Sequence, residues 1–261
     1  MYTIIIANYN RTSKLTRCLD SIDLAFNNFK RPEVIVIEDG SQKIISDDRI
    51  DKHIILSENG GPVRARLAGV KEANFEYVML LDSDDTLLES AVSTIDCTRQ
   101  NNPGYDLYGF TYKGGEALVN FEVHSIIDYS DFVSFDGRTS DYMMIAKTKV
   151  LKKYILSHSY RISEIWLFSE IFINHSCFYS KDSIFNYHQD AEVQLSKKRD
   201  FNFKFSRYER LSVSKSVEFF ISFISVCKSN SLRKAWRRRL IKESVLSFNI
   251  ITLTKMLCLK K

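Results

Sequence analysis

Three carboxylates lie within four positions of the chain, at Asp82, Asp84 and Asp85, directly after the apolar run YVMLL. Crowded carboxylates repel one another and lose hydration when buried, so they need a cation or hydrogen-bond donors beside them. Asp82 and Asp84 are separated only by Ser83, a spacing that lets both carboxylates at a strand end reach one divalent cation. Mg²⁺ and Mn²⁺ prefer oxygen ligands and commonly bind one or two carboxylates together with substrate phosphates. The cluster therefore predicts a site for a cation and a phosphorylated ligand.

Alternating strand and helix patterns place this cluster at one edge of a predicted sheet. Strand patterns occur at residues 3–7, 33–39, 53–58 and 77–82, and helical patterns at 12–26 and 62–73. The alternation predicts an α/β fold with a mostly parallel central sheet and helices on both faces. Ligands of such sheets bind beyond the carboxyl ends of the strands. Three polar clusters, NYNR, EDGSQ and DSDD, follow strand ends and indicate a site there.

Asp85 has a second interpretation. Thr86 and Glu89 have the spacing of a capping box, so a third helix is expected to open at DTLLES. Asp85 would then be a favourable charge at a helix N-terminus. This interpretation explains Asp82 and Asp84 less well, and both interpretations stay open for Asp85.

Composition limits the class of protein. The chain of 261 residues is 44% hydrophobic and 26% charged, as expected of a globular protein. Its five cysteines are widely spaced and lack a CxxC pair, which favours reduced thiols over disulfides or a zinc site. The N-terminus lacks signal-peptide features, and no stretch reaches the roughly 18 apolar residues of a transmembrane helix. We expect a cytoplasmic protein whose only membrane contact would be peripheral, on the inner face of the cell membrane.

The C-terminal region is strongly basic. Residues 197–261 carry 17 Lys and Arg against 4 Asp and Glu, whereas residues 1–196 carry 20 against 28. At helical spacing, Trp236 lies among several Arg and Lys residues, which is typical of an interfacial helix drawn to anionic lipid. A solvated basic helix that closes the domain is the alternative. Nucleic acid is not an expected partner, because no recognition motif accompanies the charge.

Four segments resemble the family 2 glycosyltransferases, which have the GT-A fold. TIIIANYNR, VIVIEDGSQ, NGGPVRARLAGVKEA and YVMLLDSDD occur in the order, spacing and strand context of that family. The resemblance is specific up to residue 90 and weaker up to residue 196. It implies a GT-A domain at 1–196, with a nucleotide-binding half at 1–105 and an acceptor half at 106–196. A basic helical extension at 197–261 follows.

The resemblance also implies donor-binding and metal-binding residues. Those expected to contact the donor nucleotide are Ala7, Tyr9, Asp39, Arg66, Asp82 and Ser83. Tyr9 would lie near the base, and Asp39 would accept hydrogen bonds from the base or ribose, with Glu38 beside it as a further candidate. Arg64 is the competing candidate for the role of Arg66. Asp82 and Asp84 match the DxD motif and would hold Mn²⁺ or Mg²⁺, which stabilises the leaving nucleoside diphosphate.

Inverting transfer also needs a base that accepts the proton of the acceptor hydroxyl. The family pattern matches Glu164 in the stretch ISEIWLFSE, but Ile165 stands where the family usually has aspartate. Glu170 and Asp190 are the other nearby carboxylates. Glu164 alternatively serves only as a charge at a helix N-terminus.

The leading hypothesis is an inverting, metal-dependent transferase of hexosyl or N-acetylhexosaminyl type. A nucleoside-diphosphate sugar, with a UDP-sugar favoured, would donate to a hydroxyl of a glycan or polyprenol-linked glycan, as in bacterial surface-polysaccharide assembly. The alternative, prompted by Ile165, is a non-catalytic nucleotide-sugar-binding or partner subunit of a polysaccharide-assembly complex. A nucleotidyltransferase is disfavoured because NYNRTSK contains no glycine, and a dinucleotide oxidoreductase because GxGxxG is absent.

Overall fold

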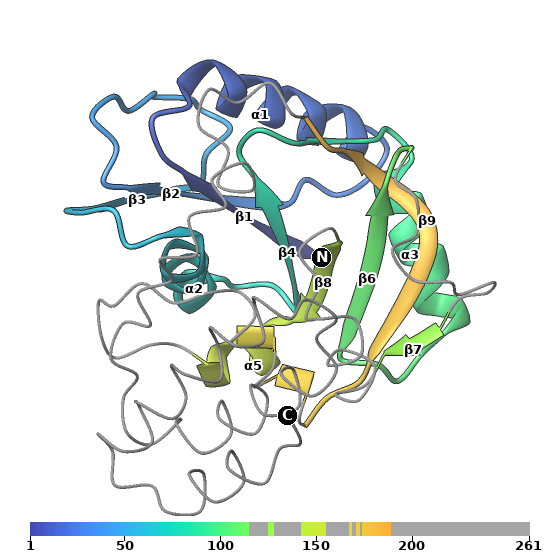
Figure 1. The fold of residues 1–261 in the computed structure, drawn as a ribbon. Helices are drawn as coiled ribbons and strands as arrows, with labels where there is room; N and C mark the ends of the chain where they lie inside the picture. Colours follow the sequence, from blue (N-terminus) through green and yellow to red (C-terminus); the bar gives the residue numbers. More distant parts are fainter. Residues whose placement is uncertain (115–124, 128–141, 155–166, 169–170, 173, 189–261) are drawn as a thin grey trace, which may run out of the picture.

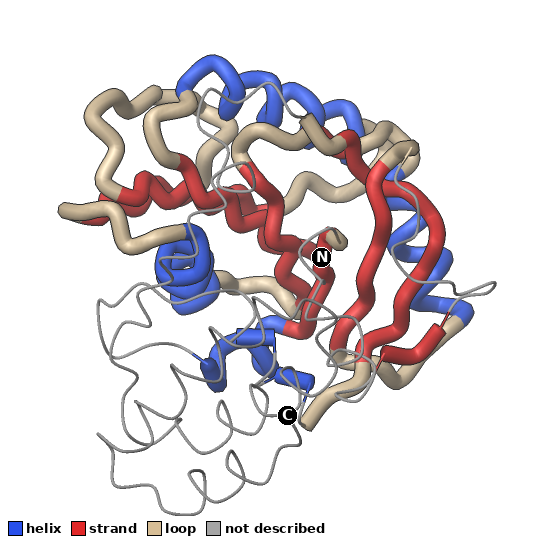
Figure 2. Tube along the Cα trace, viewed as in Figure 1, coloured by secondary structure: helices blue, strands red, loops and turns tan. Residues whose placement is uncertain are grey.

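The described part of the chain forms one sheet with helices packed against it (Figure 1). The computed structural model describes residues 1–114, 125–127, 142–154, 167–168, 171–172 and 174–188. Within these residues the strand order is β3-β2-β1-β4-β8-β6-β9-β5, and β7 pairs with β9. Figure 2 shows that loops connect the ends of these strands to the surrounding helices.

The first half of the sheet is parallel, as predicted. Its strands are β1 (Tyr2–Asn8), β2 (Glu33–Asp39), β3 (Lys52–Leu56) and β4 (Tyr77–Asp82). β1 lies between β2 and β4 and is parallel to both, and β3 extends the sheet beyond β2. The strands β1 and β2 are buried along nearly their whole length, which explains their continuous apolar sequences.

The second half of the sheet is mixed rather than mostly parallel. Its strands are β5 (Thr86–Leu87), β6 (Leu107–Tyr112), β7 (Ser125–Ile127), β8 (Met143–Lys147) and β9 (Cys177–Asn186). β8 runs antiparallel to both β4 and β6, whereas β6 and β9 are parallel. β5 and β7 pair antiparallel with β9. The prediction of a mostly parallel sheet therefore holds for the first half alone.

Helices cover both faces of the sheet, as the alternating pattern predicts. They are α1 (Thr12–Phe26), α2 (Pro62–Glu72), α3 (Ala91–Asn101), the short α5 (Thr148–Leu151) and the 3₁₀ turn η1 (Lys152–Tyr154). α1 buries an apolar stripe at helical spacing against the same core as α3. α2 lies against β1 and β2 on the opposite face.

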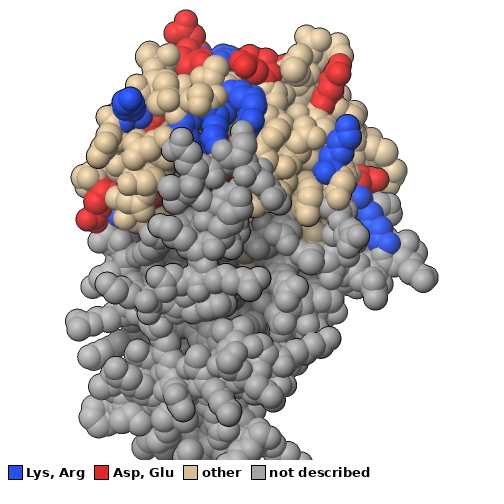
Figure 3. All heavy atoms as spheres, turned by 45° about the horizontal axis from the view of Figure 1, so that its top comes forward, with Lys and Arg blue, Asp and Glu red and all other residues tan. Residues whose placement is uncertain are grey.

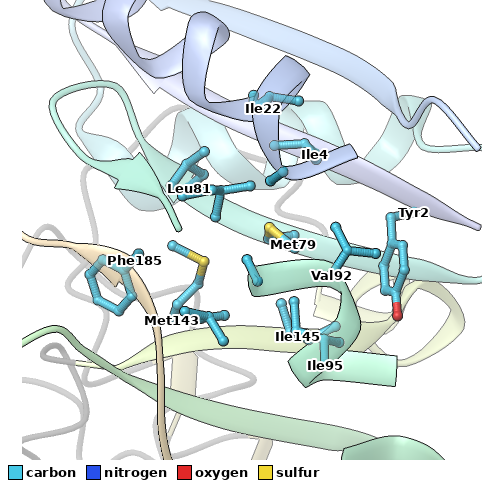
Figure 4. Packing of buried hydrophobic residues seen from close by; sticks show 14 of the residues in the cluster. Tyr2, Ile4, Ile22, Met79, Leu81, Val92, Ile95, Met143, Ile145 and Phe185 are labelled. Atoms are coloured by element: carbon cyan, nitrogen blue, oxygen red, sulfur yellow. The ribbon is translucent and has the colours of Figure 1, made fainter. Parts of the chain in front are cut away.

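The core between the sheet and the helices α1 and α3 is built from alternate strand residues. Ile4 and Met79 point toward Ile22 of α1 and Val92 of α3 (Figure 4). Phe185 of β9 closes this core from the second half of the sheet. The side chains of α1 therefore hold the start of that helix against the carboxyl ends of β1 and β4.

Gly69 lets α2 approach the sheet closely. A Cβ at this position would lie 2.7 Å from Ile37 Cδ1 and 2.7 Å from Ile5 Cγ2. Overpacking of this kind costs about 1–3 kcal/mol, and the better helix propensity of alanine returns about 1 kcal/mol. We expect Gly69→Ala to lower the free energy of unfolding by up to about 2 kcal/mol in urea denaturation. Ala68→Ser on the same helix is the control, and a more stable Gly69→Ala protein would contradict this packing.

The predicted helix start at Thr86 is wrong. Thr86 and Leu87 form β5, paired with Asn186 and Phe185 of β9, and α3 begins five residues later at Ala91. The capping-box spacing is overridden because the Thr86 hydroxyl accepts a hydrogen bond from Asn186 Nδ2 at 3.1 Å. Asp85 is therefore not at a helix N-terminus.

Later elements agree in part with the sequence. The predicted strand at 105–113 and helix at 148–156 correspond to β6 and to α5 with η1. The amphipathic helix expected at 163–176 is described at 167–168 and 171–172, where the backbone is helical and the side chains are buried. The boundary predicted at residue 196 and the basic extension at 197–261 lie outside the described residues. In the described part, no helix has the length and apolar character needed to cross a membrane.

Candidate functional site

The three polar clusters meet at one edge of the sheet. β1, β2 and β4 are adjacent and parallel, so their carboxyl ends lie side by side. In this register Ala7 of β1 is opposite Asp82 of β4, and Asn8 is opposite Glu38 of β2. The loops that follow these strands therefore start from neighbouring points, as ligand-binding loops of open α/β sheets do.

Asp39 connects the end of β2 to the loop that precedes α2. Its two carboxylate oxygens accept hydrogen bonds from the backbone N–H groups of Gly60, at 2.8 Å, and Gly61, at 2.7 Å. Each oxygen keeps a second lone pair for a ligand. Gly40 has a φ of +75°, and a Cβ there would lie 2.6 Å from the Asn59 backbone nitrogen, so this turn requires glycine.

Glu38, the weaker candidate beside Asp39, has a structural role in this arrangement. Its fully buried carboxylate accepts two hydrogen bonds from Asn8 Nδ2, at 3.1 and 2.9 Å, and lies 3.3 Å from His53 Nε2. These contacts hold the end of β1 against β2. Tyr9, which follows Asn8 in the chain, is 48% exposed and lies at the start of the loop after β1.

Arg66 of α2 reaches the end of β4. Its guanidinium forms an ion pair with the Asp82 carboxylate, and 46% of the Asp82 side chain remains exposed. Arg64 instead pairs with Glu58, at 3.3 Å, in the loop before the helix. The structure thus places Arg66 beside the carboxylates and directs Arg64 away from them.

Asp84 is held by the start of α1. Arg11 Nη1 lies 2.8 Å from Asp84 Oδ2, and Arg17 Nη2 donates a hydrogen bond to the Asp84 carbonyl oxygen at 2.8 Å. Burial raises the pKa of the Asp84 carboxyl, Arg11 opposes this change, and Asp82 reinforces it. Like charge from Asp82 and loss of water therefore make Asp84 depend on a cation.

The Asp85 carboxylate is hydrogen-bonded by the segment that follows β9. Its Oδ1 accepts a hydrogen bond from the His188 backbone N–H at 3.1 Å, and His188 Nε2 lies 3.0 Å from the Thr86 hydroxyl. Burial, followed by the charge of Asp82, raises the pKa of Asp85 to about 8. Asp85 thus links the end of β4 to the residues that follow β9.

Two observations fit a cation and a phosphorylated ligand at this place. The Ser83 side chain is 1% exposed, and its Oγ has no hydrogen-bond partner among the described residues. Asp82 and Asp84 supply carboxylate oxygens, which Mg²⁺ and Mn²⁺ prefer. No group of three or more His, Cys, Asp or Glu suited to a metal is found in the described ranges. Ligand oxygens would have to complete the coordination of any bound cation.

Charge is unevenly distributed over the surface on this side of the molecule. Figure 3 shows a group of Lys and Arg side chains near the middle of the described surface and others at its sides, with Asp and Glu along its top and sides. Positive charge in this arrangement favours anionic ligands such as phosphates.

The structure brings together most of the predicted site residues. Ala7, Asp39, Arg66, Asp82, Ser83 and Asp84 lie at the same sheet edge, with Tyr9 directly after β1. Glu164 lies outside the described residues, as do Glu170 and Asp190. Sequence reasoning missed Arg11 and Arg17 as partners of Asp84. The signal available for them was the basic residues at spacing i and i+6 where the first helix begins, directly after a strand end.

A protein-family model and several curated relatives match this chain. The model described as glycosyl transferase family 2 matches residues 3–156, more than half of the chain. GalNAc(5)-diNAcBac-PP-undecaprenol beta-1,3-glucosyltransferase of Campylobacter jejuni is 31% identical over 112 residues, which are 40% of this chain and 35% of the relative. Teichoic acid poly(glycerol phosphate) polymerase of Staphylococcus epidermidis is 35% identical over 100 residues, covering 35% and 14%. The chain thus matches well under half the length of either relative.

Solved structures share the fold. S. aureus TarS 1–349 in complex with UDP-GlcNAc has a TM-score of 0.63 and 17% identity, covering 92% of this chain and 80% of that one. Mannosyltransferase PcManGT from Pyrobaculum calidifontis, in complex with GDP-Man and Mn²⁺, has a TM-score of 0.50 and 11% identity, covering 98% and 72%. At such identities the likeness establishes the fold alone, and the predicted GT-A fold is confirmed.

Proposed function

The chain belongs to glycosyl transferase family 2, and on that premise we propose that it is an inverting, metal-dependent glycosyltransferase. A nucleoside-diphosphate sugar, with a UDP-sugar favoured, donates its sugar to a hydroxyl of a glycan or lipid-linked glycan. The observation that carries this proposal is the pair Asp82 and Asp84, which lies beyond the carboxyl end of β4 with each carboxylate balanced by an arginine.

The donor nucleotide would occupy the edge formed by β1, β2 and β4. The exposed ring of Tyr9 is available to stack on the base, and Asp39 has lone pairs left for the base or ribose. Because Ala7 is the register partner of Asp82, the backbone of β1 would lie near the same ligand. The buried Ser83 hydroxyl would gain a polar partner when the nucleotide binds.

Asp82 and Asp84 would hold Mn²⁺ or Mg²⁺ together with the donor diphosphate. When bound, such a cation stabilises the negative charge that develops on the leaving nucleoside diphosphate. Arg66 contributes a fixed positive charge from α2, because 11% of its side chain is exposed and Asp82 holds the guanidinium. A planar guanidinium is suited to phosphate oxygens as well as to carboxylates.

The acceptor hydroxyl needs a base on the face of the sugar opposite the diphosphate. We assign this role to Glu164, which sequence resemblance places in the acceptor half, residues 106–196. Proton removal by a positioned carboxylate contributes typically 10²–10⁴-fold to such a reaction. The sugar configuration is inverted because a single displacement occurs from the opposite face.

The acceptor is proposed to be a membrane-linked glycan, reached from the cytoplasm. One relative is named as a glucosyltransferase of an undecaprenol-linked glycan, and another as a teichoic acid poly(glycerol phosphate) polymerase. The basic residues of 197–261, with Trp236 among them, would draw the protein peripherally to anionic lipid on the inner face of the cell membrane. Hexosyl and N-acetylhexosaminyl donors are both compatible with this proposal.

Ile165 motivates a second candidate function. Because aspartate is usual at this place in the family, the chain would bind a nucleotide sugar without transferring it, as a partner subunit of a polysaccharide-assembly complex. This candidate requires the same donor site. It differs from the first only in predicting no transfer to any acceptor.

Calorimetric titration of the full chain with UDP, GDP and dTDP, each with and without Mn²⁺, tests the donor site. We expect one nucleotide, UDP, to bind at least about tenfold more tightly with Mn²⁺, because Asp82 and Asp84 would hold the cation and its charge would attract the phosphates. Uridine, which lacks phosphates, is the matched control and should show no dependence on Mn²⁺. A folded protein that binds none of the nucleotides under either condition would contradict both candidate functions.

A further inference from the structure

Two cationic side chains from the start of α1 contact Asp84. Arg11 forms the 2.8 Å ion pair with the carboxylate, and Arg17 donates to the carbonyl oxygen at 2.8 Å. Lys14, which lies between them in the sequence, adds a further positive charge that lowers the pKa of Asp84. The chain thus carries its own counter-charge for the carboxylate that is proposed to hold a metal.

The position of Arg11 conflicts with a cation bound at Asp84. The Asp84 side chain is only 12% exposed, so few directions of approach remain around its two oxygens. A divalent cation coordinated by this carboxylate would lie close to the guanidinium that now contacts Oδ2. Like charges at such a separation repel strongly where water is largely excluded.

Arg11 is able to change partners without disturbing the helix. It is the N-cap residue of α1, and its carbonyl oxygen accepts a hydrogen bond from the Leu15 N–H at 2.9 Å, which fixes the backbone. Its side chain is 27% exposed, compared with 11% for Arg66. The guanidinium therefore has room at the surface, whereas its point of attachment is held beside the site.

We propose that Arg11 occupies the metal-binding carboxylate of Asp84 in the free protein and moves to the donor diphosphate when cation and nucleotide bind together. This inference rests on the proposed function. The exchange keeps every charge paired: the cation replaces the guanidinium at Asp84, and phosphate oxygens replace Asp84 at the guanidinium. The planar fork of arginine forms paired hydrogen bonds with phosphate as readily as with carboxylate.

The exchange has two opposite consequences for affinity. Without a nucleotide, Arg11 competes with the metal for Asp84, so the free protein holds Mn²⁺ weakly. With a nucleotide present, Arg11 contributes to binding the diphosphate. A purely structural ion pair would have neither effect, because its loss changes stability alone.

The test is Arg11→Gln, measured by electron paramagnetic resonance of Mn²⁺ with the full chain in the absence of nucleotide. We expect the variant to bind Mn²⁺ at least about fivefold more tightly than the wild type, because the competing cation is gone. At saturating Mn²⁺, calorimetry should show UDP binding weakened about tenfold, and uridine binding unchanged. Arg11→Lys keeps the charge but loses the fork, so it should retain weak Mn²⁺ binding and still bind UDP less well.

Arg31→Gln is the matched control. Arg31 forms an ion pair of the same length, 2.8 Å, with Asp51, on an exposed surface away from the site. The Arg31→Gln substitution should change neither the Mn²⁺ affinity nor the UDP affinity. If Arg11→Gln behaves like Arg31→Gln, or if UDP binding weakens while Mn²⁺ binding does not change, the exchange is overturned. If the wild type itself binds no UDP at saturating Mn²⁺, the proposed function fails, which is a separate result.

Discussion

Asp84→Asn is expected to abolish Mn²⁺-dependent nucleotide binding and to reduce sugar transfer about 100- to 1000-fold. Asparagine has nearly the same shape as aspartate but lacks the negative charge that a divalent cation requires. Asp84 is also more buried than Asp82: 12% of the Asp84 side chain is exposed, compared with 46% of the Asp82 side chain. Its charge therefore acts in a region of low dielectric, where the loss is largest.

The measurements are UDP affinity with and without Mn²⁺ and the rate of donor consumption with a lipid-linked acceptor mixture. Asp48→Asn is the control, because Asp48 is exposed and lies in the loop between β2 and β3. Thermal unfolding must accompany the assay, since the substitution leaves Arg11 without its carboxylate partner. A folded Asp84→Asn protein that retains metal-dependent UDP binding would remove Asp84 from the metal site.

The first half of the fold was predictable because its strands and helices have consistent local signals. The bounds expected for α1, β2 and β4 agree with those observed, since buried parallel strands produce uninterrupted apolar runs. Their parallel direction then follows, because α1 connects β1 to β2 and α2 connects β3 to β4. The site edge was predictable for the same reason, because polar residues after such runs must meet at one end of the sheet.

The second half was less predictable because its pairings depend on contacts distant in sequence. Thr86 illustrates this: its local spacing is that of a capping box, but Asn186, one hundred residues away, pairs with it and makes it a strand residue. Tertiary contacts of this kind override local preference.

Arg11 was missed for a related reason. Nothing in the sequence near Asp84 identifies its partner, which is supplied 73 residues earlier by the segment that joins β1 to α1. The basic residues of that segment were evident, but their direction depends on how α1 packs across β1 and β4. Positions on a helix surface acquire a partner only when the helix is docked, and the apolar stripe of α1 determines that docking.

Glu164→Gln is expected to lower the rate constant of transfer by about 100- to 10 000-fold while leaving donor affinity unchanged. Glutamine keeps the length of the side chain and its hydrogen-bonding capacity but cannot accept the proton of the acceptor hydroxyl. The residues proposed to bind the donor lie at the ends of β1, β2 and β4, so Mn²⁺-dependent UDP binding provides an internal check on folding.

Glu170→Gln and Asp190→Asn are the matched variants, because both remove a neighbouring carboxylate in the same acceptor half. The expected pattern is a large loss of rate for Glu164→Gln alone, with loss of the acidic limb of its pH–rate profile, since a carboxylate base must be ionised to act. A large loss for one of the other two variants, with Glu164→Gln unaffected, would transfer the role to that residue.

A second substitution, Ile165→Asp, tests the neighbouring position. If Ile165→Asp restores transfer to the Glu164→Gln protein, the base can act from the position usual in the family. Turnover by none of the proteins, including the wild type, together with intact UDP binding, would instead favour the non-catalytic partner subunit.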